Sequence, residues 1–396
     1  MMSTKHSSTG NCLICNSADV AVFMEMFGVP VHCNLLWETE DQALNAETED
    51  IRLGFCEGCG HAFNLAFNPD LMQYVGDYEN SLHFSPRFQS YADELARRLI
   101  DRYELRGKDI IEIGCGRGDF LKLLCGLGDN RGVGFDPGYT DKSTGENEEQ
   151  VSFVRDFYSE NYSHYRADFI CCRHTLEHVH NPSAFLMRMR RAIGERDTAV
   201  FFEVPNAMRI WRGLAVWDII YEHCSYFNSR SLAHLFARCG FDVRNVSEAF
   251  EGQYLCIEAL PGKASEEVSS EGAESIEELS GLLAAFAGEC RRQVEHWRTR
   301  LARMKNIGQR AVIWGAGSKG VSFLNALDQK RRIEYVVDIN PRKQGKHIAG
   351  TGQRIVPPAF LVDYRPDVVI VMNAVYEDEI RSMLESLGVV AELVCV

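Results

Sequence analysis

The stretch DIIEIGCGRGDF, residues 109–120, decides the fold of this chain. Its apolar start is typical of a buried parallel strand, with Glu112 near the end of that strand. Three glycines follow at alternate positions, and a helical pattern begins at Asp119. Glycines let the backbone pass close to a ligand, and a helix N-terminus presents free N–H groups. A second strand, GVGFD at residues 132–136, ends in Asp136, an acid that suits a ribose diol.

The spacing of these glycines distinguishes two kinds of turn. Dinucleotide-binding folds use G-x-G-x-x-G, where the turn must admit a pyrophosphate. The spacing here, E-x-G-x-G-x-G, resembles motif I of the class I S-adenosylmethionine (SAM) methyltransferases. That resemblance implies that Asp136 holds the ribose hydroxyls of SAM and that the turn binds it through Glu112, Gly114, Gly116 and Gly118. The alternative is a tight turn without a ligand, but the strand, the three glycines and the downstream acid occur together.

Composition and length limit the possible functions. The chain has 396 residues, which suggests two to three domains, and its net charge of −14 argues against a nucleic-acid partner. We find no run of about twenty apolar residues and no secretory signal, so we expect no membrane association. Fourteen cysteines without a signal favour a reducing cytoplasm, with metal binding or free thiols rather than disulfides.

Two C-x2-C pairs near the N-terminus predict a metal site. Cys12 and Cys15 form the first pair, and Cys56 and Cys59 form the second. In a cytoplasmic chain this pattern is typical of one tetrahedral zinc site, with four unligated thiols as the alternative. Because four thiolates fill the coordination shell, we expect a structural Zn²⁺ rather than a catalytic one. We expect Cys33 to be a buried apolar residue, and we do not expect His61 to be a ligand.

Strands and helices alternate after residue 136. A short strand ends near Asp156, where an acid often meets the adenine amino group in methyltransferases of this class. The segment RHTLEHVHNP, residues 173–182, follows the fourth strand and brings His174, Glu177 and His178 to the sheet edge where ligands bind. Further strands near residues 198–204, 241–246 and 255–260 complete a seven-stranded sheet. Residues 61–91, rich in aromatic side chains, form either an active-site lid or a packed connector.

A second glycine-rich turn lies near the C-terminus. The stretch AVIWGAGSKG, residues 311–320, has the G-x-G-x-x-G spacing, and Asp338 follows at about the distance expected of a Rossmann-like domain. Three roles stay open for this domain: NAD binding, a nucleotide-handling site for the substrate, or a structural role. The expected domains are a zinc-binding module and lid at 1–85, a methyltransferase domain at 86–260, a linker and long helix at 261–306, and the Rossmann-like domain at 307–396.

The whole layout resembles the zinc-containing sugar C-methyltransferases, which act on nucleotide-linked deoxy-keto sugars. The resemblance covers nearly the whole chain and rests on the cysteine pairs, the SAM loop, the Leu176-Glu177-His178 segment, the Glu222-His223 pair and the C-terminal domain. It implies that His223 is the catalytic base beside Glu222, that His178 is a second pocket histidine, and that Tyr78 belongs to the lid. That family often has Tyr-x-Glu-His, whereas Ile220 and Tyr221 precede Glu222 here. The tyrosine's role therefore does not carry over directly.

The chemistry of carbon methylation gives these residues expected roles. A carbon becomes nucleophilic after a proton next to a carbonyl is removed, and histidine is the side chain that titrates near neutrality. We expect His223 to remove that proton and Glu222 to orient it or hold a sugar hydroxyl. The enolate needs hydrogen-bond donors, for which His178, Tyr221 and Tyr78 are the candidates. We expect His174 to contact the cofactor and a thymidine-diphosphate-linked sugar to be the substrate. The alternatives are O- or N-methylation of another metabolite, a NAD-linked enzyme, and a scaffold with a relic SAM fold.

Overall fold

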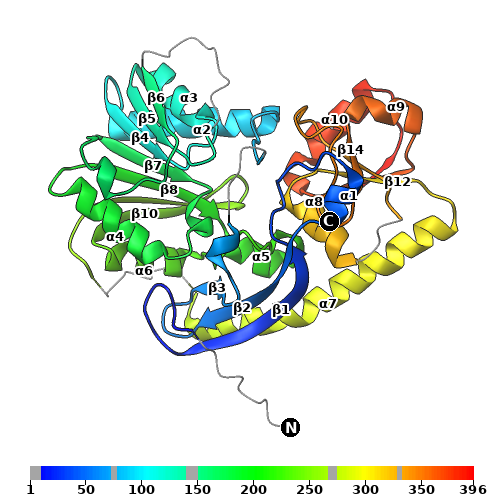
Figure 1. Ribbon diagram of the computed structural model, residues 1–396, viewed down its shortest axis with the longest axis horizontal. Coiled ribbons are helices and arrows are strands. Elements are labelled where there is room, and N and C mark those ends of the chain that lie inside the picture. Colours follow the sequence, from blue (N-terminus) through cyan, green and yellow to red (C-terminus); the bar gives the residue numbers. More distant parts are fainter. Residues whose placement is uncertain (1–9, 73–77, 140–149, 266–273, 328–331) are drawn as a thin grey trace, which may run out of the picture.

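The protein contains a mostly parallel seven-stranded sheet, a parallel five-stranded sheet and an antiparallel four-stranded sheet. The computed structural model describes residues 10–72, 78–139, 150–265, 274–327 and 332–396. The polar N-terminus and most of the linker at 262–273 therefore lie outside the described residues. Figure 1 shows the seven-stranded sheet and the C-terminal domain side by side, with the helix α7 running below both. Within the described residues no helix is long and apolar enough to cross a membrane.

The seven-stranded sheet has the strand order β10-β11-β8-β7-β4-β5-β6, with β11 antiparallel to its neighbours. This is the order of a class I SAM methyltransferase, as the sequence predicts. Apolar residues alternate between its faces, so Ile110 packs with the helices on one side and Ile111 with those on the other. The strands are β4 (Asp109–Ile113), β5 (Arg131–Phe135), β6 (Val151–Val154), β7 (Phe169–Arg173), β8 (Ala199–Pro205), β10 (Phe241–Ala249) and β11 (Tyr254–Pro261).

Helices cover both faces of this sheet. One face carries α2 (Pro86–Tyr103) and α3 (Asp119–Gly128), and the other carries α4 (Pro182–Ile193) and α6 (Ser229–Arg238). Helix α2 begins at Pro86 because the Ser85 hydroxyl accepts the Phe88 N–H, and it ends at Glu104, which adopts a left-handed conformation. Its buried residues recur every three or four positions, which is the spacing that covers one face of a helix.

The C-terminal domain repeats the same principle on a smaller scale. Its parallel sheet has the order β14-β13-β12-β15-β16. The strands are β12 (Ala311–Trp314), β13 (Tyr335–Val337), β14 (Arg354–Val356), β15 (Val368–Val371) and β16 (Glu392–Cys395). The helices are α8 (Ser318–Leu327), α9 (Leu361–Tyr364) and α10 (Glu377–Ser386). The strand-turn-helix predicted from the second glycine motif is thus present as β12, its turn and α8.

An N-terminal antiparallel sheet, which the sequence reading does not predict, joins the two domains. It consists of β1 (Val20–Pro30), β2 (Thr48–Cys56), β3 (Ala62–Asn64) and β9 (Ser225–Tyr226). Helix α1 (Glu40–Leu44) interrupts the connection between β1 and β2. The short strand β9 comes from the methyltransferase segment and pairs with β3, so this sheet is fixed to the methyltransferase domain.

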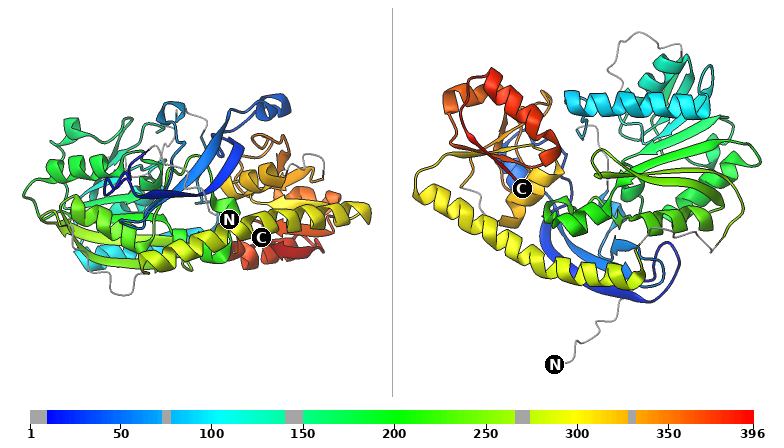
Figure 2. Two further views of the ribbon diagram at one scale, coloured as in Figure 1. Left: turned by 90° about the horizontal axis from the view of Figure 1, so that it is seen from below. Right: turned by 180° about the vertical axis from the view of Figure 1, so that it is seen from behind.

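The long helix predicted within residues 261–306 is α7 (Ile276–Asn306). Ser275 and Glu278 close a capping box at its start. Near its beginning Phe286 packs against Trp211 of α5 (Ala207–Gly213), and further on Trp297 packs against Phe323 of α8. The helix therefore braces both domains from one side, as Figure 2 shows from below and behind.

Candidate functional site

The four predicted zinc cysteines lie together. Their sulfur atoms all lie within 4.8 Å of one another, with Cys12 to Cys59 at 3.6 Å and Cys15 to Cys56 at 3.4 Å. A tetrahedral zinc with bonds of about 2.3 Å would separate its sulfurs by about 3.8 Å, so the cluster fits Zn²⁺ in size and in ligand type. The Ile14 N–H donates to the Cys12 sulfur, which would help to neutralise a thiolate.

The surroundings of this cluster indicate a structural role. His61 is fully buried between the rings of Phe63 and Phe227, and burial lowers its pKa to about 3. Its Nδ1 lies 4.0 Å from the Cys12 sulfur, so it packs beside the cluster. The Asn228 side chain donates to the Gly60 carbonyl and fixes the second cysteine turn against α6. The described lining of the main cavity includes none of the four cysteines.

A cavity of about 920 Å³ lies between the methyltransferase domain and the C-terminal domain. Its lining comes from the carboxyl ends of the strands of both sheets and from described residues of the predicted lid, among them residues 78–85 just before α2. Ligands of doubly wound sheets bind beyond the carboxyl ends of the strands. Each sheet would hold a ligand at one such position, and the cavity spans both positions.

The SAM loop forms one wall of this cavity. Gly114, Gly116 and Gly118 all have positive φ angles, which side chains other than glycine rarely adopt. A Cβ at Gly114 would meet the Thr175 Oγ1 at 1.9 Å, and one at Gly118 would meet the Phe153 ring at 2.3 Å. Gly114 and Gly116 line the cavity, whereas Gly118 permits the packing behind it.

The predicted acids surround that loop. Asp136 accepts the N–H groups of Gly116 and Gly138, each at 2.8 Å, and burial raises its pKa. Glu112 is 3% exposed, and burial raises its pKa to about 8. Within the described structure one oxygen of Glu112 has no hydrogen-bond partner. Asp156 lines the cavity beside Phe157 and accepts the Tyr162 hydroxyl at 2.6 Å.

A buried cluster of charged side chains lies below the SAM loop, at the end of β7. Both Nε and Nη2 of Arg173 donate to Glu203 Oε1, at 3.0 and 2.8 Å, and His174 Nε2 lies 2.8 Å from the same oxygen. Burial alone would raise the pKa of Glu203, but Arg173 and His174 lower it to about 2. His174 has a φ of +49°, a conformation that costs energy in a residue with a Cβ. The sequence motifs assign no role to Arg173 or Glu203.

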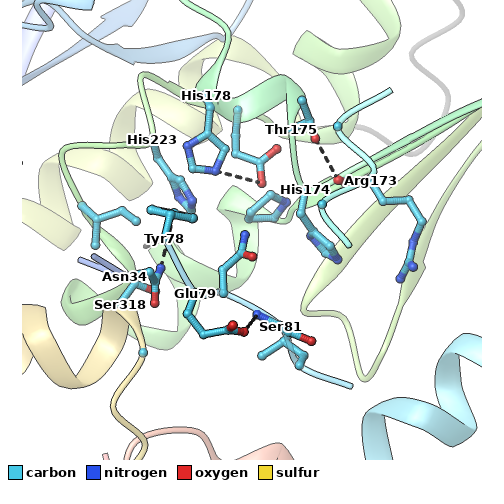
Figure 3. Close-up of a pocket in the computed structure, with 18 of the residues that line it drawn as sticks. Asn34, Tyr78, Glu79, Ser81, Arg173, His174, Thr175, His178, His223 and Ser318 are labelled. Carbon is cyan, nitrogen blue, oxygen red and sulfur yellow. Dashed lines mark hydrogen bonds and ion pairs between the residues drawn. The ribbon is translucent and has the colours of Figure 1, made fainter. Parts of the chain in front are cut away.

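Two neighbouring histidines line the cavity. His178 belongs to a 3-10 turn (Leu176–His178) after β7, and His223 precedes β9. Their rings are 4.9 Å apart in an edge-to-face arrangement, which Figure 3 shows. Burial lowers the pKa of both histidines, and His178 lowers that of His223 further. Both rings are therefore held in the neutral form near pH 7, as a general base requires.

The other three predicted catalytic residues are placed differently from one another. Tyr78 lines the cavity beside Asn34. Glu222 is fully buried behind the lining, where its Oε2 accepts the Cys33 N–H at 2.9 Å. Burial raises the pKa of Glu222, but His32, His178 and Tyr78 bring it below its usual value. Tyr221 points away from the cavity, because its hydroxyl accepts the Asn68 N–H at 2.8 Å and its ring packs on Phe67.

The C-terminal domain supplies the opposite wall. Gly315, Gly317 and Gly320 line it, and Asp338 Oδ2 accepts the Ala316 N–H at 2.9 Å. Lys343 is 6% exposed, and its Nζ donates to the carbonyl of Ala316 at 3.2 Å. Lys319 lies 3.0 Å from Asp218. The sequence motif alone does not identify Lys343, although this residue follows β13 and Asp338 closely enough to reach the turn.

Comparisons with known proteins agree with this architecture. The family model described as a methyltransferase domain matches residues 87–246, and the model described as a C-methyltransferase C-terminal domain matches residues 262–390. The C-methyltransferase NovU of Streptomyces niveus is 24% identical over 385 residues, covering 93% of this chain and 90% of NovU. The two matched regions correspond to the two walls of the cavity.

Two solved structures that are similar to this chain each match about half of it. The magnesium protoporphyrin IX methyltransferase ChlM from Synechocystis PCC 6803 with bound S-adenosylhomocysteine is 14% identical, with a TM-score of 0.36, and covers 47% of this chain and 90% of its own. A SAM-dependent methyltransferase from Aquifex aeolicus is 13% identical, with a TM-score of 0.36, and covers 49% of this chain and 99% of its own.

Proposed function

Because this chain belongs to the SAM-dependent C-methyltransferase family, we propose that it methylates a carbon of a nucleotide-linked deoxy-keto sugar, with His223 as the base. The observation that carries the proposal is one cavity that two glycine-rich loops line from opposite domains, with the paired rings of His178 and His223 also in its lining. One loop suits an adenosyl cofactor and the other a nucleotide. The reacting carbon would then lie between them.

SAM supplies an electrophilic methyl group when it is bound, and the residues of the first loop suit its parts. Glu112 offers a buried carboxylate oxygen to a cationic amino group. Asp136 is at the strand end that suits a ribose diol. Asp156 and Phe157 lie at the rim, where an adenine ring would contact a carboxylate and an exposed aromatic face. The buried group of Arg173, His174 and Glu203 keeps the floor rigid.

The second loop supports a nucleotide diphosphate as the substrate's handle. Its spacing is that of pyrophosphate-binding turns, and the start of α8 presents backbone N–H groups. Lys319 and Lys343 add positive charge to the cavity wall, which suits phosphate oxygens. We propose the thymidine diphosphate form because the family resemblance implies it.

The reaction then follows from the residues between the loops. His223 takes the proton from the carbon next to the ketone, and the electron pair of that C–H bond forms an enolate. His178 and Tyr78 also line the cavity and are the candidate donors to the enolate oxygen. The bound cofactor would supply its methyl group to the enolate carbon, with the sulfur–methyl bond breaking as the carbon–methyl bond forms, and the proton on His223 would pass to solvent. Glu222, buried behind the lining, holds the segment that carries His223.

The His223→Ala variant tests the base directly. We expect turnover to fall by about 10²- to 10⁴-fold, the usual contribution of a general base, while the affinity for SAM stays close to wild type. Steady-state kinetics and calorimetric titration with S-adenosylhomocysteine measure the two effects. Near-wild-type turnover in this variant would contradict the proposal.

Hydrogen exchange separates carbon methylation from the alternatives. Without SAM, the wild type should exchange the proton of the methylated carbon with solvent deuterium, and His223→Ala should not. If the enzyme instead methylates an oxygen or a nitrogen, the substrate would take up no deuterium at carbon. Mass spectrometry of the recovered substrate gives the result.

We also propose that Zn²⁺ occupies the four-cysteine cluster and stabilises the fold. Replacing Cys56 by Ser should remove the zinc and lower the melting temperature, because metal binding at such sites contributes to folding. Cys395→Ser is the matched control, since this thiol lies in the C-terminal sheet. Elemental analysis and thermal unfolding check both variants, and a zinc-free protein with the wild-type melting temperature would oppose a stabilising role.

A further inference from the structure

Glu79 is a buried carboxylate at which three parts of the chain meet. Its side chain is 2% exposed, and its backbone N–H donates to the Asn34 carbonyl at 2.9 Å. Oε2 accepts Arg117 Nη2 at 2.9 Å and Arg342 Nη1 at 3.3 Å. Oε1 accepts Asn340 Nδ2 at 3.1 Å. One side chain of the lid segment therefore contacts the SAM loop and the C-terminal domain together.

Both sets of donors are fixed by the glycine-rich loops. Arg117 stands between Gly116 and Gly118 of the SAM loop. On the other side, the Asn340 Oδ1 accepts the Arg342 N–H at 3.0 Å, which directs the Asn340 amide group toward Glu79. Asp338 accepts the N–H groups of both Asn340 and Ala316. The carboxylate of Glu79 is thus connected to both loops through short chains of hydrogen bonds.

A second contact crosses the same boundary. The Arg342 guanidinium lies over the Phe84 ring, 5.4 Å from its centroid, and Phe84 belongs to the same lid segment as Glu79. Breaking a buried ion pair by removing one partner costs several kcal/mol, because a buried charge is left without compensation. The lid segment therefore has its lowest energy only when both loops hold their residues in place. Tyr78, next to Glu79, shares that dependence.

We propose that Glu79 is a positioning residue that couples the two ligand sites, so that each ligand raises the protein's affinity for the other and brings Tyr78 over the cavity. The inference rests on the proposed function, since it needs a nucleotide on the second loop. A ligand that orders the SAM loop fixes Arg117, which favours the Glu79 bridge and with it the C-terminal half of the site. By linkage, the coupling factor must be the same in both directions.

The test is calorimetric titration of S-adenosylhomocysteine and thymidine diphosphate, each alone and each in the presence of the other. In the wild type we expect each ligand to raise the protein's affinity for the other by at least about fivefold. Glu79→Gln removes the charge and keeps the shape, so the factor should fall to about one. The affinities for the single ligands should change little. Glu94→Gln, an exposed carboxylate on α2, is the matched control and should keep the wild-type coupling.

The outcomes separate this inference from the proposed function. If the wild type does not bind thymidine diphosphate, the proposed substrate is wrong and the coupling falls with it. If both ligands bind and Glu79→Gln keeps the wild-type factor, the inference alone is overturned. Should Glu79→Gln fail to fold, Arg342→Gln replaces a partly exposed donor and should lower the factor as well. A merely structural Glu79 would change stability without changing this factor.

Discussion

The two glycine-rich loops of this protein have the same construction in different surroundings. When the strands of each sheet are numbered in chain order, both sheets contain the spatial order 3-2-1-4-5. Each loop follows strand 1 of its sheet, which is β4 in one sheet and β12 in the other. In each, the first glycine donates its N–H to the neighbouring strand, Gly114 to Phe135 and Gly315 to Val337, at 2.8 Å. In each, an acid at the end of that strand accepts an N–H of the turn. The backbone solution is therefore the same.

The side chains make the difference. Two positions before the first glycine, the SAM loop has Glu112 and the second loop has Ile313. Besides the strand-end acid that each loop has, the first loop has Glu112, whereas Lys319 and Lys343 lie beside the second. A positively charged sulfonium with an amino group suits the first environment, and a diphosphate suits the second. Thus backbone geometry prepares a site for a ligand, and local charge selects which ligand it takes.

The glycines offer the strongest way to break the comparison. Gly114→Ala places a Cβ against Thr175 at a positive φ, so we expect a loss of at least about 100-fold in affinity for S-adenosylhomocysteine. A Cβ at Gly317 meets nothing within 4 Å, so Gly317→Ala should change the free energy of unfolding by less than about 0.5 kcal/mol. The Cβ of Ala at position 317 would still face a bound diphosphate, so the affinity for thymidine diphosphate should fall by about tenfold. Calorimetry and thermal unfolding measure these effects, and equal losses for both ligands in either variant would contradict them.

Charge replacement sharpens the comparison with a smaller effect. Asp136→Asn should lower the affinity for S-adenosylhomocysteine by about tenfold, because an amide replaces a carboxylate that accepts two N–H groups. The affinity for thymidine diphosphate should stay unchanged. Lys343→Gln should do the reverse. The salt dependence of nucleotide binding should also decrease in Lys343→Gln. A variant that weakens both ligands equally would mean that the two loops do not select separate ligands.

The sequence predicted local features better than distant contacts. Strand β4 begins at Asp109 and helix α3 begins at Asp119, where the apolar run and the helical pattern predict them. The antiparallel N-terminal sheet was missed, because β1 has two register shifts and β9 pairs with β3 from far along the chain. These pairings leave no periodic signal in either segment alone.

The candidate site shows the same division. Both cysteine pairs and the acids of the first loop could be found from spacing, since neighbours in sequence set their geometry. Tyr221 and Glu222 are adjacent to His223 in an irregular segment, where spacing does not tell which side chain faces the cavity. The contacts of Glu79 with Arg117 and Asn340 join residues 38 and 261 positions apart. Only the fold brings such residues together.

The pH dependence of binding gives the smallest expected difference between the loops. Burial raises the pKa of Glu112 to about 8, so this carboxyl is mostly protonated at pH 7 in the free protein. A cationic amino group favours the ionised form, so cofactor binding must release the proton below pH 8. The affinity for S-adenosylhomocysteine should therefore rise between pH 7 and 8, by less than tenfold for a single proton.

The second loop provides the control, because Ile313 occupies the place of Glu112 and cannot titrate. The affinity for thymidine diphosphate should stay nearly constant over the same interval, and Glu112→Gln should flatten the profile for S-adenosylhomocysteine. Calorimetric titrations in buffers of different ionisation enthalpy would count the released proton directly. An unchanged pH profile in Glu112→Gln would assign the proton to another group, and the buried carboxyl would then not be what distinguishes the first loop.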